Sequence, residues 1–356
     1  MSIAFPLEPV LRLLVLAAIV FNVVLVLTYV ERKVLGHIQQ RLGPMRTGFH
    51  GVLQAPADAI KLMFKEDLTP NTADRAVFQL APFLVFVPIF MMFVTIPATA
   101  ALVVRNLDLG LFYLVAFSSL HIVGLLMAGW GSDNKYALLG GVRSAAQLIS
   151  YELPLAFAVM GIVLVTGTLN LREVVEGQDK YPYLLVQPLG ALIFIIASLA
   201  EMGRTPFDIP MAESEVVGGP WVEYSGMRWA IFFLGEYASL FGSCALMVVL
   251  YLGGWMVPFL PADSPLSAPA GLLLFVLKTS ALVFGVFWLR GTLPRLRIDQ
   301  LMDFAWKMLI PFSLLNLVAT AGLIVYKPEL PVVASMGLAL SFLFGYVVYL
   351  RTRRTA

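Results

Sequence analysis

The sequence predicts an all-α polytopic membrane protein, a bundle of helices that cross the bilayer. Hydrophobic residues make up 60% of the 356 residues and charged residues only 13%, whereas about a quarter of the residues in soluble domains are charged. The mean hydropathy is +0.87. Apolar runs of about 20 residues, which suffice to cross a hydrocarbon core roughly 30 Å thick, recur along the chain. We expect helices, because barrel strands alternate polar and apolar residues over about 10 positions.

Nine such runs occur, and each is expected to form one spanning helix. They cover residues 10–30, 76–97, 109–129, 146–168, 184–203, 229–257, 270–290, 305–326 and 332–350. The first run follows no basic leader, so we expect it to remain as a helix rather than to be cleaved. No linker or internal repeat divides the chain, which indicates a single integral membrane domain over residues 1–356.

Basic residues predict the orientation of the bundle. Of the 24 Lys and Arg residues, 18 lie on or beside alternate connections and only five on the opposite side. The remaining one, Lys278, lies inside the seventh run. Since basic residues favour the cytoplasmic side, the N-terminus is predicted outside and the C-terminus inside. The cytoplasmic segments are then 31–75, 130–145, 204–228, 291–304 and the tail from Arg351.

The longest polar connection is residues 31–75, and its second half has helical periodicity. Apolar residues recur every three or four positions between Val52 and Phe64, with Asp58 and Lys61 among them. This spacing predicts a short amphipathic helix at the membrane interface, where it could line an entrance for an amphiphile. The alternative is a solvated loop whose basic residues only enforce the orientation.

Carboxylic acids are concentrated between the fifth and sixth runs. Six of the 22 acids lie there: Glu201, Asp208, Glu213, Glu215, Glu223 and Glu236. An ionised group near the bilayer centre costs about 2.5–3.5 kcal/mol, so acids at membrane depth indicate proton or cation movement or a polar ligand. Glu152 joins them, because it follows the expected start of the fourth run by about 10 Å of helix. The alternative is a structural ion pair with Lys278 or Arg143.

The residues available for redox chemistry are few. The chain has one cysteine, Cys244, and three histidines, too few for an iron–sulfur cluster or a membrane haem. It also lacks a phosphate-binding glycine motif, so any metal, flavin or nucleotide is expected on another chain. His121 is the one histidine inside a run, and we interpret it as a packed or interhelical hydrogen-bonding group rather than a proton relay.

The polar segments carry long motifs in a fixed order. They include E-R-K-V-L-G-H-I-Q-Q-R-L-G-P from Glu31, S-D-N-K-Y-A-L-L-G-G-V-R-S-A-A-Q-L-I-S-Y-E to Glu152, R-T-P-F-D-I-P from Arg204, and L-P-R-L-R-I-D-Q-L-M from Leu293. From about residue 31 to residue 310, they resemble the family of the quinone-chamber membrane subunit of respiratory complex I, NADH-quinone oxidoreductase. The resemblance implies eight spanning helices, so the ninth run and its basic tail, 331–356, are an addition.

The resemblance also implies an activity and its residues. Members form a chamber that admits quinone, here ubiquinone or menaquinone, and couple its reduction to proton translocation in a bacterial inner membrane.

Positions matching the quinone tunnel are Arg32, Gln39, Arg41, Asp58, Phe233, Arg295 and Arg297. Positions matching the proton relay are Glu152, Glu201, Glu213, Glu215, Glu223 and Glu236, and Asp208 matches the loop aspartate. No covalent cofactor is implied. Implied partners are peripheral-arm quinone-site and iron–sulfur subunits, small membrane subunits, antiporter-like subunits and lipid, but not nucleic acid.

The chain departs from the family pattern in the acidic loop. Met211 replaces a common family acid, so that carboxylate cannot be essential here. Gly203 replaces a polar residue, and Pro220-Trp221 differs from the usual aromatic and polar pair. We therefore expect the backbone of segment 204–228 to differ from that of relatives.

Two other functions are compatible with parts of the pattern. One is the homologous subunit of a membrane-bound hydrogenase or ferredoxin-linked complex, which the tunnel motifs around Arg32 and Asp58 disfavour. The other is a free-standing cation-coupled transporter, for which two related halves with paired broken helices are expected. The chain shows no such symmetry: Pro82 and Pro88 interrupt the second run without a counterpart.

Overall fold

The computed structural model describes residues 7–209, 213–257, 267–326 and 330–355, and these segments are built from helices without a strand. The longer helices are α1 (Leu7–Ile38), α3 (Arg75–Met92), α4 (Gly110–Gly131), α5 (Lys135–Thr166), α8 (Pro188–Glu201), α10 (Gly226–Tyr251), α11 (Ser267–Thr292), α13 (Ile310–Tyr326) and α14 (Leu330–Thr355). The shorter ones are α2 (Gln54–Phe64), α6 (Leu171–Glu176), α7 (Tyr183–Val186), α9 (Glu213–Val216) and α12 (Ile298–Phe304). Among the described residues, seven helices are long and apolar enough to cross a membrane.

The fifth predicted helix is wrong as a continuous span. Residues 184–203 form the short α7 and the 14-residue α8, which meet at Gln187 and Pro188. Proline has no backbone N–H and begins α8 at its first turn, where none is needed. The buried Gln187 amide donates to the Gly161 carbonyl and to Thr320 Oγ1, each at 2.9 Å, and so ties the break to α5 and α13. The eighth predicted run, 305–326, begins with a π-helical turn over Ala305–Leu309, through which α12 joins α13.

Two other predicted helices are longer than expected, because they extend into segments assigned to loops. α1 runs to Ile38, so Arg32 lies on the helix itself. α5 begins at Lys135, where the Asn134 side chain accepts from the Tyr136 backbone N–H. Glu152 therefore lies about 25 Å along α5 from its start, not about 10 Å. The small residues of this first half of α5 allow it to pack closely, which periodicity alone does not reveal.

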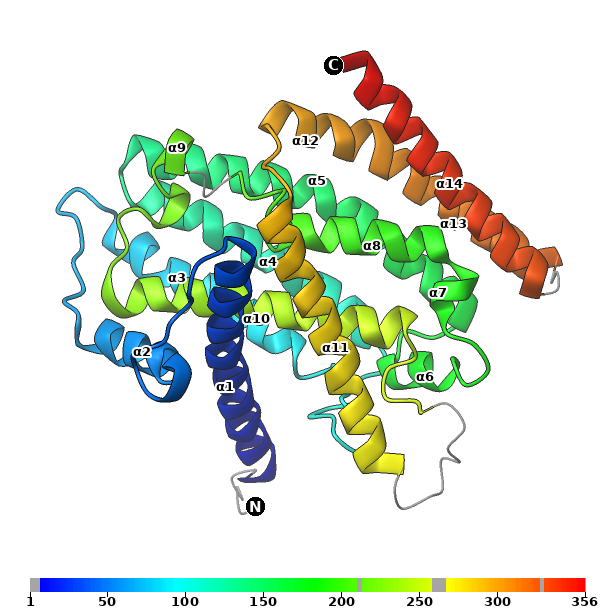
Figure 1. Cartoon of the computed structure of the whole chain (residues 1–356), viewed down its shortest axis with the longest axis horizontal. Helices are drawn as coiled ribbons and strands as arrows, with labels where there is room; N and C mark the ends of the chain where they lie inside the picture. The colour runs from blue at the N-terminus through cyan, green and yellow to red at the C-terminus, as the bar shows by residue number, and fades with distance from the viewer. Residues whose placement is uncertain (1–6, 210–212, 258–266, 327–329, 356) are drawn as a thin grey trace, which may run out of the picture.

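α5 forms the centre of the bundle, with α4, α8 and α13 packed around it (Figure 1). α3 lies between α4 and α10. The α3–α4 contact requires a glycine: a Cβ atom on Gly124 would lie 2.7 Å from both the backbone nitrogen and Cγ2 of Val85. Backbones that approach this closely gain van der Waals contact in a lipid environment, where burial of apolar surface contributes little to association.

Two further groups of helices pack on this centre. α1 and α11 run side by side against α10, as Figure 1 shows, and α2 lies beside them. α2 forms in the predicted amphipathic segment and exposes Ile60, Met63 and Phe64. The ninth run forms α14, which packs against α7 and α8; Gly337 lies directly over Pro188.

The close approach of α3 and α4 gives a test of the packing. Gly124→Ala should destabilise the protein by about 1–3 kcal/mol, because the added methyl group meets backbone rather than a movable side-chain end. The midpoint of thermal denaturation in detergent micelles measures this. Gly285→Ala is the matched control, since nothing lies within 4 Å of its added Cβ; it should leave the midpoint unchanged or raise it through helix propensity. Equal midpoints for the two variants would contradict the packing described.

Candidate functional site

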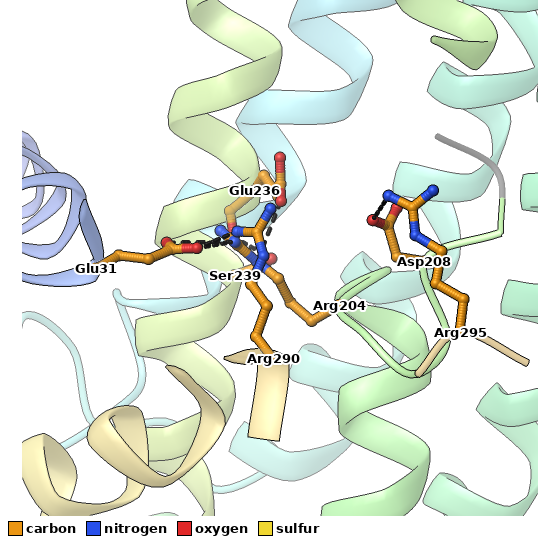
Figure 2. A network of polar contacts seen from close by, with 7 residues as sticks. All are labelled: Glu31, Arg204, Asp208, Glu236, Ser239, Arg290 and Arg295. Atoms are coloured by element: carbon orange, nitrogen blue, oxygen red, sulfur yellow. Dashed lines mark hydrogen bonds and ion pairs between the residues drawn. The ribbon is translucent and has the colours of Figure 1, made fainter. Parts of the chain in front are cut away.

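A buried arginine lies where α1, α8, α10 and α11 meet. Arg204 follows the end of α8 and is 2% exposed. Its Nη1 lies 3.0 Å from Glu31 Oε1 of α1, and its Nε lies 3.1 Å from Glu236 Oε1 of α10. Figure 2 shows both carboxylates pointing at the guanidinium from opposite sides. Charges this deeply buried are stable only when paired, so the three side chains are fixed together.

A second arginine and an aromatic ring complete the surroundings of Arg204. Arg290 of α11 also pairs with Glu31, so two guanidinium groups face two carboxylates. The Arg204 Cζ atom lies 4.5 Å from the centroid of the Tyr237 ring, within cation–π distance. Burial acts to lower the pKa of Arg204, but the charges of Glu236 and Glu31 keep it above the ordinary value. Arg204 therefore remains a cation.

The backbone that carries Arg204 is held by hydrogen bonds. α8 ends at Glu201, and Gly203 then turns the chain with a φ of +62°, in the left-handed region that glycine favours. The Gln147 amide of α5 then donates to the carbonyls of Ala200 and Phe207, each at 2.8 Å. This local geometry explains why a glycine occupies position 203, a departure that the sequence alone left without a reason.

Asp208 lies on the other side of the same loop. Its Oδ2 accepts from Arg295 Nη2 at 3.0 Å (Figure 2). Burial raises the pKa of Asp208 above its ordinary value, although the charges of Arg295, Arg290 and Arg204 act in the opposite direction. The carboxyl group can therefore change its protonation closer to neutrality than an exposed aspartate does.

A cavity with a mainly apolar wall that carries several polar side chains extends from Glu236 into the bundle. Its volume is about 50 Å³, and Glu236 and Glu201 both line it. The other polar side chains on its wall are His121, Ser144, Gln147, Trp221 and Ser239. A cavity of this size has room for a few water molecules beside its polar side chains, since each needs about 10–15 Å³ of such volume.

A smaller cavity continues toward Glu152. It measures about 20 Å³, and Glu201 lines it as well, together with Ser118 of α4 and Ser243 of α10. Ser118 Oγ donates to Glu152 Oε1 at 3.4 Å, and Ser119 donates to the same oxygen. Glu201 thus lies on the walls of both cavities, and Glu152 accepts from Ser118, which lies on the wall of the smaller one.

The predicted tunnel residues of α1 and α2 also meet. Arg32 Nη1 lies 2.6 Å from Asp58 Oδ2, and Gln54 Nε2 donates to Asp58 Oδ1 at 3.1 Å. Burial acts to raise the pKa of Asp58, but its hydrogen bond to Arg32 and the charge of Arg32, with help from Gln54 and Lys61, hold it below the ordinary value. Arg32 and Asp58 are only partly buried, so they remain reachable by a ligand.

Phe233, the predicted tunnel residue of α10, lies in a row of aromatic rings that leads to the buried arginine. It stacks on Trp229 with ring centroids 5.1 Å apart, and its centroid lies 4.7 Å from that of Tyr237. The three residues are four positions apart and so lie on one face of α10. The last of the three rings, that of Tyr237, packs against the guanidinium group of Arg204.

Other predicted site residues are not gathered at this centre. Arg297 is exposed and pairs locally with Asp299, while Gln39 accepts from Arg41 at 2.8 Å. Glu215 pairs with Arg143, and Glu223 accepts from Asn134 at 2.6 Å. The backbone of Glu213 lies in α9, but its side chain and Met211 are outside the described residues. Lys278 donates to the carbonyls of Leu252 and Gly254 at the end of α10, not to an acid.

Sequence reasoning missed three residues that the structure places at the centre: Glu31, Arg204 and Arg290. Glu31 is an acid within an apolar helix and is 2% exposed. It therefore has the same high cost of an ionised group at membrane depth that marks the other acids as functional candidates. Its position at the assumed end of the first run concealed it. In the described part of the chain, no three His, Cys, Asp or Glu side chains gather as metal ligands.

Comparison with known proteins identifies the family of the chain. A family model described as NADH dehydrogenase matches residues 11–321. The H subunit of NADH-quinone oxidoreductase from Brevibacillus brevis is 48% identical over 318 residues, 89% of this chain and 94% of the relative. The H subunit from Bacillus cytotoxicus is 50% identical over 296 residues, 82% of this chain and 86% of the relative. The H subunit from Dehalococcoides mccartyi is 43% identical over 336 residues, 94% of this chain and 92% of the relative. The chain therefore belongs to the NADH dehydrogenase family, together with these membrane subunits of NADH-quinone oxidoreductase.

Proposed function

We propose that this chain, as a multi-pass membrane subunit of a proton-translocating NADH-quinone oxidoreductase, holds the quinone near Arg32, Asp58 and Phe233. In this proposal the charge change of quinone reduction passes through Arg204 to Glu236, Glu201 and Glu152. Reduction of a quinone to a quinol takes up two electrons and two protons, so it changes the charge balance wherever its protons are drawn. The electrons would come from a cofactor on another chain of the complex.

One observation carries the proposal: Arg204 is shared between Glu31 of α1 and Glu236 of α10. Glu31 immediately precedes Arg32, which pairs with Asp58, and Glu236 lines the cavity that reaches Glu201. A shift of charge near α1 therefore alters how strongly Arg204 holds Glu236 as a carboxylate. Such coupling between two sites is a differential stabilisation of protonation states.

The coupling can be written as a sequence of steps for this chain's residues. When negative charge is added near α1, Arg204 and Arg290 are drawn toward it and Glu236 is less stabilised as an anion. Glu236 then takes up a proton from the cavity. That proton then leaves through Glu201. The Ser118 and Ser119 hydroxyl groups transmit the change of charge at Glu201 to Glu152. Glu213, Glu215, Glu223 and Asp208 belong to the proposed relay as its loop members.

The rest of the arrangement is part of the same proposal. The chain would form one integral membrane domain in a bacterial inner membrane, N-terminus outside, with quinone-site, iron–sulfur, small membrane and antiporter-like subunits around it. Gln39, Arg41, Arg295 and Arg297 would line the quinone path, and ubiquinone and menaquinone share the headgroup chemistry required. The names of the three relatives support the quinone-linked complex over a hydrogenase or ferredoxin-linked one.

The quinone path is tested at the Arg32–Asp58 pair. Arg32→Ala and Asp58→Asn should each lower turnover with a short-chain quinone by about tenfold, which corresponds to about 1.4 kcal/mol of lost transition-state stabilisation. Electron transfer to a hydrophilic acceptor that takes electrons upstream should be unchanged. An equal loss with both acceptors would indicate failed assembly and contradict the role in quinone binding.

The same pair predicts a pH dependence. The lowered pKa of Asp58 keeps the ion pair intact above the ordinary aspartate value of about 3.9 and loses it only as the pH falls through the lowered value. The ratio of Asp58→Asn turnover to native turnover should therefore be constant between about pH 6 and pH 8. A ratio that rises steadily toward pH 6 would show that Asp58 titrates there and would contradict a permanent pair.

The relay is tested by amide substitutions in assembled membranes. Glu236→Gln, Glu201→Gln and Glu152→Gln should each lower quinone turnover and proton pumping together, by tenfold or more, because general acid–base groups contribute about 10²–10⁴ to proton transfer. Glu176→Gln is the matched control, since this acid pairs with Arg172 on α6, away from the cavities. Full pumping in the relay variants would exclude the assignment.

A further inference from the structure

His121 occupies an unusual position on the wall of the larger cavity. It lies on α4, within the bundle, and lines the space that Glu201 and Glu236 also line. The sequence favoured a packed or interhelical hydrogen-bonding role for it. The structure contradicts the second half of that expectation, because neither ring nitrogen bonds to any described residue.

A second polar group on the same wall is also without a partner. The indole Nε1 of Trp221 is buried and has no hydrogen-bond partner among the described residues. Trp221 lies in the short 3₁₀ turn Gly219–Trp221 and stacks on Phe232, with centroids 5.4 Å apart. Buried polar groups are nearly always paired, so the unpaired Trp221 N–H, on a wall that His121, Glu201 and Glu236 share, indicates water inside the cavity.

We propose that His121 relays protons through cavity water between Glu236 and Glu201. The proposal rests on the function proposed above and assigns to it a residue that the acids alone do not include. In the relay, a proton from Glu236 reaches one ring nitrogen of His121 through water, while the proton on the other nitrogen leaves through water to Glu201. One N–H bond forms as the other breaks, and the imidazole returns to neutrality.

The chemistry of the cavity wall favours histidine for this step. A neutral imidazole presents one donor and one acceptor, whereas the Trp221 indole can only donate. Ser144 and Ser239 are hydroxyl groups that can hold water but do not ionise, and Gln147 is engaged with the Ala200 and Phe207 carbonyls. Among the groups on this wall, His121 alone is a base that the carboxyl groups can protonate.

The charged groups around His121 come from two of the helices that form the cavity. α8 contributes Glu201 and α10 contributes Glu236, which Arg204 holds from the far side. α5 contributes only Ser144, Gln147 and Leu148 to the wall, and α3 contributes Val85. His121 thus has a proton source and a proton sink, and the remaining wall offers no competing ion pair.

The test compares three substitutions in the assembled complex in native membranes. His121→Gln keeps hydrogen bonding to water but cannot exchange protons, His121→Leu removes both, and His37→Gln makes the same chemical change at an exposed position on α1. Rates of short-chain quinone reduction, protons pumped per electron, and the solvent deuterium isotope effect on turnover are measured for each. Electron transfer to an upstream hydrophilic acceptor reports assembly.

Both His121 variants should pump about tenfold more slowly, less than the roughly 10²–10⁴ that a proton-transfer group contributes, because water leaves a residual path. Their solvent isotope effect should exceed the native value, since proton transfer then limits turnover. His37→Gln should match native protein. Mere structural damage would lower the amount of active complex without raising the isotope effect, and that outcome would overturn the proposal.

Parallel variants separate this inference from the relay itself. If Glu201→Gln and Glu236→Gln stop pumping while His121→Gln behaves as native, the carboxylate relay stands and the role of His121 is excluded. If Trp221→Phe raises the isotope effect as much as His121→Gln, hydration of the cavity and not the imidazole is responsible. If the Glu variants pump normally, the relay proposal itself fails.

Discussion

The pairing of one buried arginine with two carboxylates is the constraint on which the rest of the site depends. Arg204 cannot stay charged in the interior unless Glu31 and Glu236 remain beside it, and neither acid could stay ionised there without a cation. This mutual requirement fixes α1 and α10 around the turn that follows α8. Gln147 of α5 holds that turn through the carbonyls of Ala200 and Phe207.

The group formed by Arg204, Glu31 and Glu236 is suited to transmit a change of charge and not only to stabilise the fold. Buried ion pairs contribute little net stability compared with apolar packing, because desolvation offsets their attraction. They do, however, respond strongly to a nearby charge, since the surrounding dielectric constant is low. The two cavities then matter because they leave space beside Glu201, and the larger one also beside Glu236, in a region where most side chains are closely packed.

Several features of the site were predictable from the sequence because they rest on residue type and cost. The acids Glu152, Glu201 and Glu236 stand out in apolar segments, and the structure places Glu236 and Glu201 on the wall of one cavity. Motif resemblance assigned Arg32 and Asp58 to the quinone tunnel, but only the structure shows that they form an ion pair. By contrast, Glu31 was hidden by a helix boundary drawn too early. The break at Gln187 and Pro188 was hidden by an apolar run that hydropathy could not divide.

By itself, the sequence determined that the chain is a multi-pass helical membrane protein of a recognisable family, because composition and motifs are local properties. Only the tertiary structure decided which charges meet. Arg204 is 173 positions away from Glu31 in the chain, and no periodicity relates them. Whether His121 packs, bonds or faces water likewise depended on how α4, α8 and α10 leave a cavity between them, which is a property of their packing and not of any one segment.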